Sequence, residues 1–490
     1  MIKNFFNCKI YSMENDEIFT SMQIKNNEIV GLSIENIQNK NWLNIDLGGK
    51  FILPGFIDTH THSFEGGLYS LGADLSHSKS IKDVLEIIES ANPIGEMIFA
   101  FHFDENSIKE KRFPTIDELD KISPKIPLLL RRVDGHSCVI NSSAKKLMLA
   151  ENPNLNLQSQ ILTKEENDYA AHFFHKKVNL EGIESAYLNS AKIGINNGLT
   201  TIHTMIGDAN QNPLHFKWMK NNLTKFPLEF ILYPQILNVK KAMELGADRV
   251  GGCILADGSF GSHTAGLTKP YFDQKENFGQ LYQSNDFWID FVKEAHDNDL
   301  QVGVHAIGDA AIEQILTAYE IAQKENPKDL RHEIIHCELT SDAQIERMSK
   351  ANVSAVMQPM FDRLWGGRNG FYDKVLGAER TERTTRLKSI KTAGILLTGG
   401  SDFYITDLNP IKGIDAAERI HNINEALDRK EAVELYTINA AKLSHDEDRI
   451  GSIKIGKQAD FIICQNDPFK LKSFLDLEIS QVFKNGVKIK

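Results

Sequence analysis

The chain has 490 residues, of which 41% are hydrophobic and 25% are charged, and its formal net charge is −11 at pH 7. This length exceeds one ordinary hydrophobic core, so we expect one large domain with one or two smaller ones. The acidic balance, with no run rich in lysine and arginine, argues against nucleic acid or an anionic membrane as a partner.

Residues 1–50 have the pattern of short strands separated by turns. The strands that we expect are Phe5–Tyr11, Ile18–Ile24 and Ile29–Ile34. The last of them follows the turn Lys25-Asn26-Asn27. This segment has too little apolar surface to fold alone, so it requires a partner elsewhere in the chain.

The middle of the chain repeats a short apolar run, a polar or glycine-rich break and a helical pattern. The eight runs expected as strands are Phe51–Thr61, Leu199–Thr204, Leu228–Tyr233, Gly252–Asp257, Gln301–His305, Glu333–Cys337, Val353–Gln358 and Ile395–Asp402. The expected helices include Ile183–Asn196, Phe287–Asp297, Ala310–Lys324 and Asp342–Lys350. Eight such units are typical of a parallel (β/α)8 barrel.

An insertion at about 65–185 separates the first barrel strand from the second, and it has expected strands of its own at Met97–Phe101 and Pro127–Arg131. The C-terminus again predicts strands, at Asp460–Cys464, Val482–Lys484 and Val487–Ile489. Asn485-Gly486 is a strong hairpin signal between the last two. The predicted fold class is therefore α/β: a TIM-like barrel over 54–447, a small β-sandwich domain from residues 1–53 and 448–490, and an α/β insertion.

Residue types that bind metals fall at the ends of the predicted strands. His60 and His62 end the first strand, and residues i and i+2 of a strand share one face. His305, His336 and Asp402 end the fifth, sixth and eighth strands. A single histidine at a strand end is more often structural, but the strand ends of a barrel converge on one mouth. Imidazole and carboxylate are ligands for zinc-like metals, so five such residues together predict a metal centre.

These motifs resemble the amidohydrolase superfamily, in the branch of amidohydrolase family 3 that is related to N-substituted formamide deformylase. The resemblance runs over almost the whole chain. It rests on Pro-Gly-Phe-Ile-Asp-Thr-His-Thr-His at 54–62, Gly-Leu-Thr-Thr-Ile-His at 198–203, Ala-Asp-Gly-Ser-Phe-Gly-Ser-His-Thr-Ala at 256–265, His-Ala-Ile-Gly-Asp-Ala-Ala at 305–311, Gly-Ser-Asp at 400–402 and the tail at 451–460.

The resemblance implies roles for these residues. His60 and His62 would hold one metal with Asp402, and His305 and His336 would hold a second. Asp402 would also act as general base on the attacking water. The chain departs from the pattern at Cys253, which stands where much of the family has a carboxylated lysine that bridges the metals. A thiolate is a strong zinc ligand, so Cys253 is either a bridging ligand or a small buried residue of the strand.

Several further residues are weaker candidates. Three in the loop after the fourth strand are expected to face the substrate: Asp257, Ser259 and His263. Two in the insertion either close over the pocket or form a turn: Asp134 and His136. His203 ends the second strand and is expected to support the ligands. Gln358, Arg363 and Arg368 follow the seventh strand, where an arginine would meet a substrate carboxylate, whereas Cys337 is expected to pack on the opposite face from His336.

Three functions compete for this sequence. The first is hydrolysis of a non-peptide carbon–nitrogen bond in an amide, a formamide or an N-acyl compound, with one or two zinc-like metals per chain. The second is a single-metal deaminase of an aminated heterocycle, but such enzymes usually have a glutamate three residues beyond the fifth-strand histidine, where this chain has Gly308 and then Asp309. The third is a non-catalytic member of the family, against which the intact ligand set argues.

The expected partner is a small-molecule substrate, and a homodimer is a reasonable prior for a soluble enzyme. No apolar run approaches the roughly 20 residues that span a bilayer, and Met1–Ser21 lacks the apolar core of a signal peptide. The five cysteines are odd in number and widely spaced. They fit a reducing compartment better than a disulfide framework, so the expected location is the cytoplasm.

Overall fold

The computed structural model describes residues 1–133, 135 and 137–490, together with the side chains of these residues apart from 164, 165 and 168. The predicted pocket residues Asp134 and His136 therefore lie outside the described residues. The chain divides into two compact units: Met1–Thr61 with Ile193–Lys490, and His62–Lys192.

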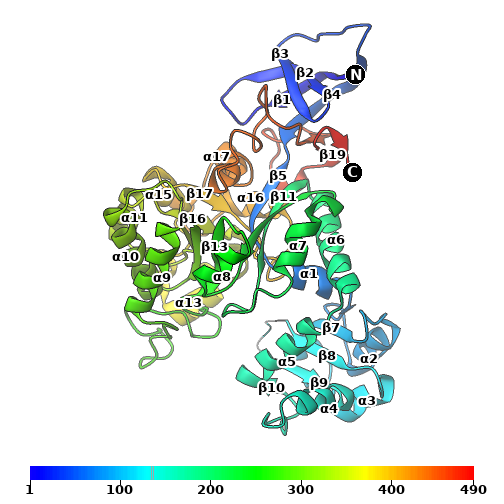
Figure 1. Cartoon of the computed structure of the whole chain (residues 1–490), viewed down its shortest axis with the longest axis vertical. Helices are drawn as coiled ribbons and strands as arrows, with labels where there is room; N and C mark the ends of the chain where they lie inside the picture. Colours follow the sequence, from blue (N-terminus) through cyan, green and yellow to red (C-terminus); the bar gives the residue numbers. More distant parts are fainter. Residues whose placement is uncertain (134, 136) are drawn as a thin grey trace. The chain divides into compact units, whose positions relative to one another are not determined.

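A seven-stranded sheet combines both ends of the chain (Figure 1). Its order is β20-β19-β18-β4-β1-β2-β3. The strands are β1 Ile2–Tyr11, β2 Ile18–Lys25, β3 Glu28–Ser33, β4 Leu43–Pro54, β18 Phe461–Cys464, β19 Ile479–Lys484 and β20 Val487–Lys488. Phe5 packs edge-on against Phe461 and Phe483, with ring centroids 5.3 and 5.4 Å away. Residues from the two termini thus share one hydrophobic core.

The first unit also contains eight parallel strands with helices outside them, a TIM-barrel-like α/β arrangement (Figure 1). The strands are β5 Phe56–Thr61, β11 Leu199–Ile206, β12 Glu229–Pro234, β13 Arg249–Leu255, β14 Gln301–Ala306, β15 Glu333–His336, β16 Ser354–Met357 and β17 Leu397–Gly399. Their hydrogen-bonded ladders form two groups, β12-β11-β5 and β13-β14-β15-β16-β17. Packing of β12 beside β13 and of β17 beside β5 connects the two groups.

The outer helices are α7 Phe216–Asn222, α8 Val239–Glu244, α9 Asn285–Asp297, α10 Asp309–Glu325, α11 Asp342–Lys350, α12 Pro359–Trp365, α13 Phe371–Leu376, α14 Ala378–Thr381, α15 Leu387–Thr392, α16 Pro410–Ala417, α17 Arg429–Leu435 and α18 Ile438–Leu443. Most barrel strands are buried along their whole length because helices cover their outer side. One prediction needs correction: Phe51–Thr61 is two strands, since Pro54 lacks an N–H donor and Gly55 separates β4 from β5.

The second unit is a five-stranded sheet with helices. Its strands, in the order β10-β9-β8-β7-β6, are β6 Ala73–Asp74, β7 Ile98–Phe103, β8 Leu128–Arg132, β9 Ser137–Ile140 and β10 Leu162–Thr163. Its helices are α1 Ser63–Tyr69, α2 Ile81–Ser90, α3 Ile116–Ile122, α4 Ser142–Glu151 and α5 Lys164–Lys176, and α6, Leu180–Asn196, leads back to the first unit. The sequence predicts β7 and β8 but misses the short strands β6, β9 and β10.

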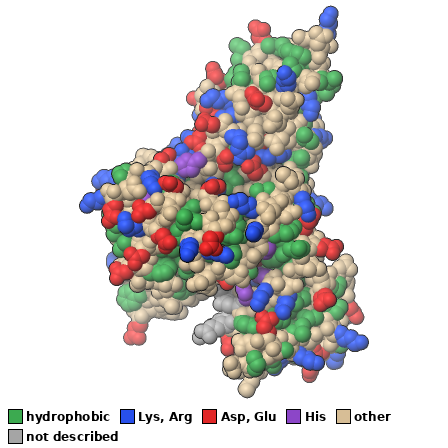
Figure 2. All heavy atoms as spheres, in the orientation of Figure 1, with side chains coloured by type: hydrophobic (Ala, Val, Ile, Leu, Met, Phe, Trp, Pro, Cys, Tyr) green, Lys and Arg blue, Asp and Glu red, His purple; other side chains and the backbone are tan. Residues whose placement is uncertain are grey.

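The surface carries both signs of charge. On the face drawn in Figure 2, acidic and basic side chains are interspersed rather than gathered into one large patch. Among the described residues, no helix is both long enough and apolar enough to cross a bilayer.

Candidate metal centre

The end of β5 places His60 beside the segment that follows β17. The backbone N–H of Asp402 donates a hydrogen bond to the carbonyl of His60, at 2.9 Å. The carboxylate of Asp58 accepts hydrogen bonds from the backbone N–H groups of both His60 and Ser401. These bonds hold the Asp402 carboxylate close to the His60 ring, with 3.3 Å between Oδ1 and Nε2.

Glycine makes this approach between the two segments feasible. A Cβ atom added to Gly400 would lie 2.8 Å from the Cβ of His60 and 2.9 Å from its backbone nitrogen. The sequence predicted Asp402 as the last residue of the eighth strand. β17 instead ends at Gly399, so Asp402 lies in the loop beyond it. Asp402 has a φ of 53°, a left-handed conformation that is uncommon for a residue with a side chain and is concentrated at functional sites.

A bulge in β13 presents Cys253. Along the ladder with β14, Gly251 pairs with Gly303, and the next pair is Ile254 with Val304. Residues Gly252 and Cys253 are therefore extra residues on β13, and such bulges redirect side chains at functional sites. Gly251 and Gly252 have φ values of 92° and 86°, which only glycine adopts readily.

β14 and β15 supply the other two histidines. The rings of His305 and His336 meet edge-to-face with centroids 4.5 Å apart. Nε2 of His305 lies 3.0 Å from the carbonyl oxygen of Gly258 and 3.5 Å from Oδ1 of Asp257. His336 and the following Cys337 both have left-handed φ values, 69° and 52°, so the chain turns sharply where β15 ends.

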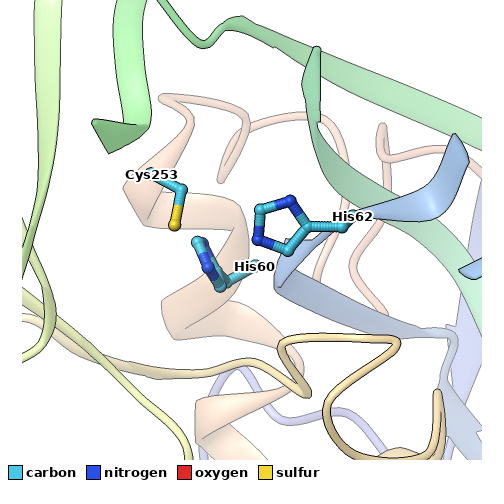
Figure 3. A group of neighbouring side chains, drawn as sticks. All are labelled: His60, His62 and Cys253. Atoms are coloured by element: carbon cyan, nitrogen blue, oxygen red, sulfur yellow. The ribbon is translucent and has the colours of Figure 1, made fainter. Parts of the chain in front are cut away.

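Three groups of these side chains could each hold a metal ion. They are His60, His62 and Cys253; Cys253, His305 and His336; and His60, His336 and Asp402. Within each group the ligand atoms all lie within 4.8 Å of one another. Figure 3 shows the first group, with the two imidazole rings and the Cys253 sulfur turned toward one another. Cys253 is shared by two groups, as a bridging ligand would be.

The surroundings of two of the imidazoles, His60 and His305, favour added positive charge. Burial acts to lower the pKa of His60, but hydrogen bonds and negative charge from Asp402 and Cys253 outweigh it and raise the pKa to about 9. Burial also acts to lower the pKa of His305, but Cys253 and Asp257 outweigh it and raise this pKa to about 9. Burial and the neighbouring His305 lower the pKa of His336 to about 4.

The donor set therefore fits a divalent cation. Imidazole nitrogen, thiolate sulfur and carboxylate oxygen are the ligand types of zinc and similar borderline metals. Five of the six residues are buried: His60, Cys253, His305, His336 and Asp402. A cation would supply the positive charge that His60 and His305 otherwise take up as protons.

The predicted pocket residues after β13 have different surroundings. Asp257 is fully buried, and its carboxylate accepts hydrogen bonds from the backbone N–H groups of Gly266, Ile307 and Gly308. It thus holds the loops around His305, which does not favour direct contact with a substrate. The Ser259 hydroxyl lies 3.0 Å from that of Ser262, and His263 Nε2 lies 2.9 Å from Asp273 Oδ2.

The remaining candidates lie in three kinds of place. His203 lies within β11 rather than at its end, with Nδ1 3.3 Å from the Tyr233 hydroxyl. Arg363 and Arg368 are paired with Asp415 and Glu382 and have exposed side chains. Cys337 is buried, and its sulfur contacts that of Met348 at 4.0 Å.

Asp58 and Glu338 are buried carboxyls near the centre that were not predicted from the sequence. Asp58 stands inside the Gly-Phe-Ile-Asp-Thr-His-Thr-His motif, and a charged residue in a fully buried strand could have indicated it. Glu338 is a buried carboxyl in the turn beyond His336. Its only sequence signal is its spacing of two residues from that histidine.

Comparison with known proteins gives a consistent result. Residues 44–488 match the model of the amidohydrolase family. The chain is 27% identical to the putative amidohydrolase YtcJ of Bacillus subtilis and 24% identical to N-substituted formamide deformylase of Arthrobacter pascens, each over 90% of this chain and 89% of the relative. An uncharacterized metal-dependent hydrolase from Pyrococcus furiosus has a similar structure, with a TM-score of 0.82 and 26% identity over 96% of this chain and 100% of that one.

Proposed function

Because this chain belongs to the amidohydrolase family, we propose that it is a metal-dependent hydrolase of a non-peptide carbon–nitrogen bond in an amide, a formamide or an N-acyl compound. The observation that carries the proposal is the set of three ligand groups that share Cys253, His60 and His336 at the ends of the barrel strands. The formamide deformylase relative supports the bond class, at low identity.

The proposed ligands would hold one or two zinc-like ions. His60 and His62 would hold one ion with Asp402, His305 and His336 would hold the other, and Cys253 would lie between them. When bound, such an ion supplies Lewis acidity, which polarises a carbonyl and makes a nearby water more acidic. If Cys253 is only a packing residue, the centre would hold a single tightly bound ion.

Asp402 is the group that moves the proton. It is mostly buried, and its carboxylate is held beside His60, where it can meet a water molecule that is aligned with the substrate carbonyl. It accepts a proton as the water oxygen bonds to the carbonyl carbon. It returns that proton to the nitrogen as the carbon–nitrogen bond breaks, so a carboxylic acid and an amine leave and the side chain regains its starting state.

The deaminase alternative loses support in the structure. The position where those enzymes have their glutamate is Gly308, and its backbone N–H donates to Asp257. The next residue, Asp309, accepts a hydrogen bond from the backbone N–H of Thr268 and another from its hydroxyl. Asp309 is therefore engaged in holding the loop and is not placed to protonate a substrate ring.

The first test combines metal content with substitution of the base. Elemental analysis of protein purified without chelator should find one or two equivalents of a divalent metal per chain, and the protein should release amine from N-formyl and N-acyl amines. Asp402→Asn should keep much of the metal but lower kcat by at least about a thousandfold, because the proton acceptor is lost.

Asp407→Asn, five residues further on at an exposed aspartate, is the matched control and should keep full activity. Retention of activity in Asp402→Asn would remove Asp402 as the base. Absence of metal after reconstitution with zinc would show that the ligand groups have been misinterpreted.

A further inference from the structure

Glu338 is a buried carboxyl that the proposed hydrolysis does not use. It lies two residues beyond His336, the last residue of β15, and only 3% of it is exposed. The hydroxyl of Tyr372 is among the polar groups near it. Its Oε2 atom is buried and has no hydrogen-bond partner within the described part of the chain. Buried polar atoms are nearly always paired, so an unpaired carboxylate oxygen calls for a ligand or a water.

The backbone fixes Glu338 beside the metal centre. The N–H groups of Cys337 and Leu339, on either side of it, donate to the carbonyls of Ala306 and Ile307. Those two residues directly follow His305 in the chain. Glu338 is consequently held against the end of β14, and His305 is among the charged groups that act on it.

A second unpaired acceptor follows the neighbouring strand. Gln358 comes directly after β16 and is 3% exposed. Its Nε2 donates to the carbonyl of Val356 at 3.4 Å, which leaves Oε1 buried with no hydrogen-bond partner among the described residues. β15 and β16 pair in parallel with Ile335 opposite Val356, so the two acceptors follow the same edge of the sheet.

We propose that Glu338 and Gln358 accept hydrogen bonds from donor groups of the substrate, which makes the substrate an amide that also carries an N–H or ammonium group near the scissile bond. This inference rests on the proposed function. A site built to bind a donor rejects an analogue without it, because the buried acceptors then stay unpaired. The ring of the neighbouring Phe361 is stacked on that of His336, with centroids 5.6 Å apart, and offers an apolar surface to the rest of such a molecule.

The test uses pairs of substrates of equal size on the zinc-loaded full chain. N-formyl diamines of increasing length are compared with N-formyl alkylamines in which a methyl group replaces the second amine. For at least one length, we expect kcat/KM to favour the diamine derivative by about a hundredfold or more. Glu338→Gln keeps the shape of the side chain, and Gln358→Met removes the second acceptor. Each should lower that preference at least about tenfold and leave the alkylamine derivative nearly unchanged.

Glu382→Gln, at a partly exposed glutamate beyond α14, is the matched control and should keep the preference. Equal loss on both substrates in Glu338→Gln would assign Glu338 a structural role and overturn the proposal, as would a wild type without preference. Calorimetric binding of diamines against alkylamines to the zinc-loaded protein tests the same preference without turnover. Tighter diamine binding without any amide hydrolysis would reject the proposed function while supporting the donor site, and equal binding would reject the donor site.

Discussion

Under the proposed function, Cys253 would determine how many metal ions the centre holds. Its sulfur belongs to the group with His60 and His62 and also to the group with His305 and His336. The one remaining group combines His60 and His336, one histidine from each set, with Asp402. A thiolate between the two sets adds negative charge at the point where two cations would repel each other most strongly.

Substitution of this cysteine gives a prediction at the scale of one residue. Cys253→Ala should lose at least about half of the bound metal after dialysis, because a ligand shared by both sets is removed. Cys253→Asp restores an anionic ligand and should recover part of the metal. Metal content is measured by elemental analysis and affinity by competition with a chromogenic chelator.

Cys337→Ala is the control for the loss of a buried thiol. Cys337 adjoins His336 in sequence, but its sulfur packs against Met348. We expect this variant to bind metal like the wild type and to lose only packing energy. Equal metal content in Cys253→Ala and Cys337→Ala would return Cys253 to the role of a packing residue.

Prediction of the site from sequence succeeds where a residue type and a strand end coincide. The structure brings together the six predicted ligands: His60, His62, Cys253, His305, His336 and Asp402. Their role in binding metal stays a prediction. The sequence predicted that Asp257 faces the substrate and could not show its role in holding loops. Its three backbone partners come from loops that only the fold brings together.

At the scale of elements, the bulge in β13 turns the Cys253 side chain toward the candidate histidine ligands. Gly251 is essential to it, because a Cβ atom there would lie 2.2 Å from the carbonyl oxygen of Gly303 on β14. Neither backbone can move away without breaking the ladder. The left-handed φ of 92° adds strain for any residue with a side chain.

Gly251→Ala should therefore lower the free energy of unfolding by more than about 1 kcal/mol and also reduce metal affinity, because the bulge and Cys253 shift together. The matched control is Gly394→Ala. Gly394 has a similar φ of 79°, but nothing lies within 4 Å of its added Cβ. The Gly394→Ala variant should lose about 1 kcal/mol of unfolding free energy from backbone strain alone and keep full metal binding. Denaturant unfolding and metal titration of both variants separate strain from displacement; unchanged metal affinity in Gly251→Ala would dissociate the bulge from the site.

The sequence could not reveal this bulge, since a bulge is a mismatch between two strands and periodicity describes only one. Gly251-Gly252 was the available signal, yet paired glycines equally predict a turn. The strands β6 and β10 escaped prediction because two residues show no alternation. The helix α11, by contrast, begins and ends where its pattern predicts, and Ser341 caps it with a capping box.

At the scale of the whole molecule, buried charges connect the terminal sheet to the barrel. Lys484 on β19 is buried and donates to Glu229 on β12 at 2.8 Å and to Asp460 at 2.7 Å. Glu229 also receives two hydrogen bonds from Arg449. Loss of Glu229 would leave the buried Lys484 with Asp460 as its remaining carboxylate partner among these residues, so the two parts of this unit are expected to unfold together.

A pair of buried histidines makes the stability of the molecule depend on pH. The backbone N–H of Val302 donates to Nδ1 of His332, so His332 carries its proton on Nε2, 2.9 Å from Nδ1 of His296. Nε2 of His296 lies 2.6 Å from the carbonyl oxygen of Asn326. Every nitrogen in this chain of bonds has a partner only while both rings are neutral. Burial, with a contribution from His296, lowers the pKa of His332 from 6.5 to about 3.

The sign of the effect follows from this shift. Between pH 6.5 and about 3 the unfolded chain binds a proton at His332 that the folded chain does not, so acid favours unfolding in that window. The contribution of this group to the free energy of unfolding falls by up to about 1.4 kcal/mol for each pH unit below 6.5. His332→Gln can accept from Val302 and donate to His296 without titrating. It should be less stable than the wild type at pH 7.5, and the difference in Tm should shrink as the pH falls to 5.

His77→Gln, at an exposed histidine, is the control, and its Tm should change with pH as that of the wild type does across the same range. A difference between wild type and His332→Gln that stays constant with pH would show that His332 does not titrate between the two states.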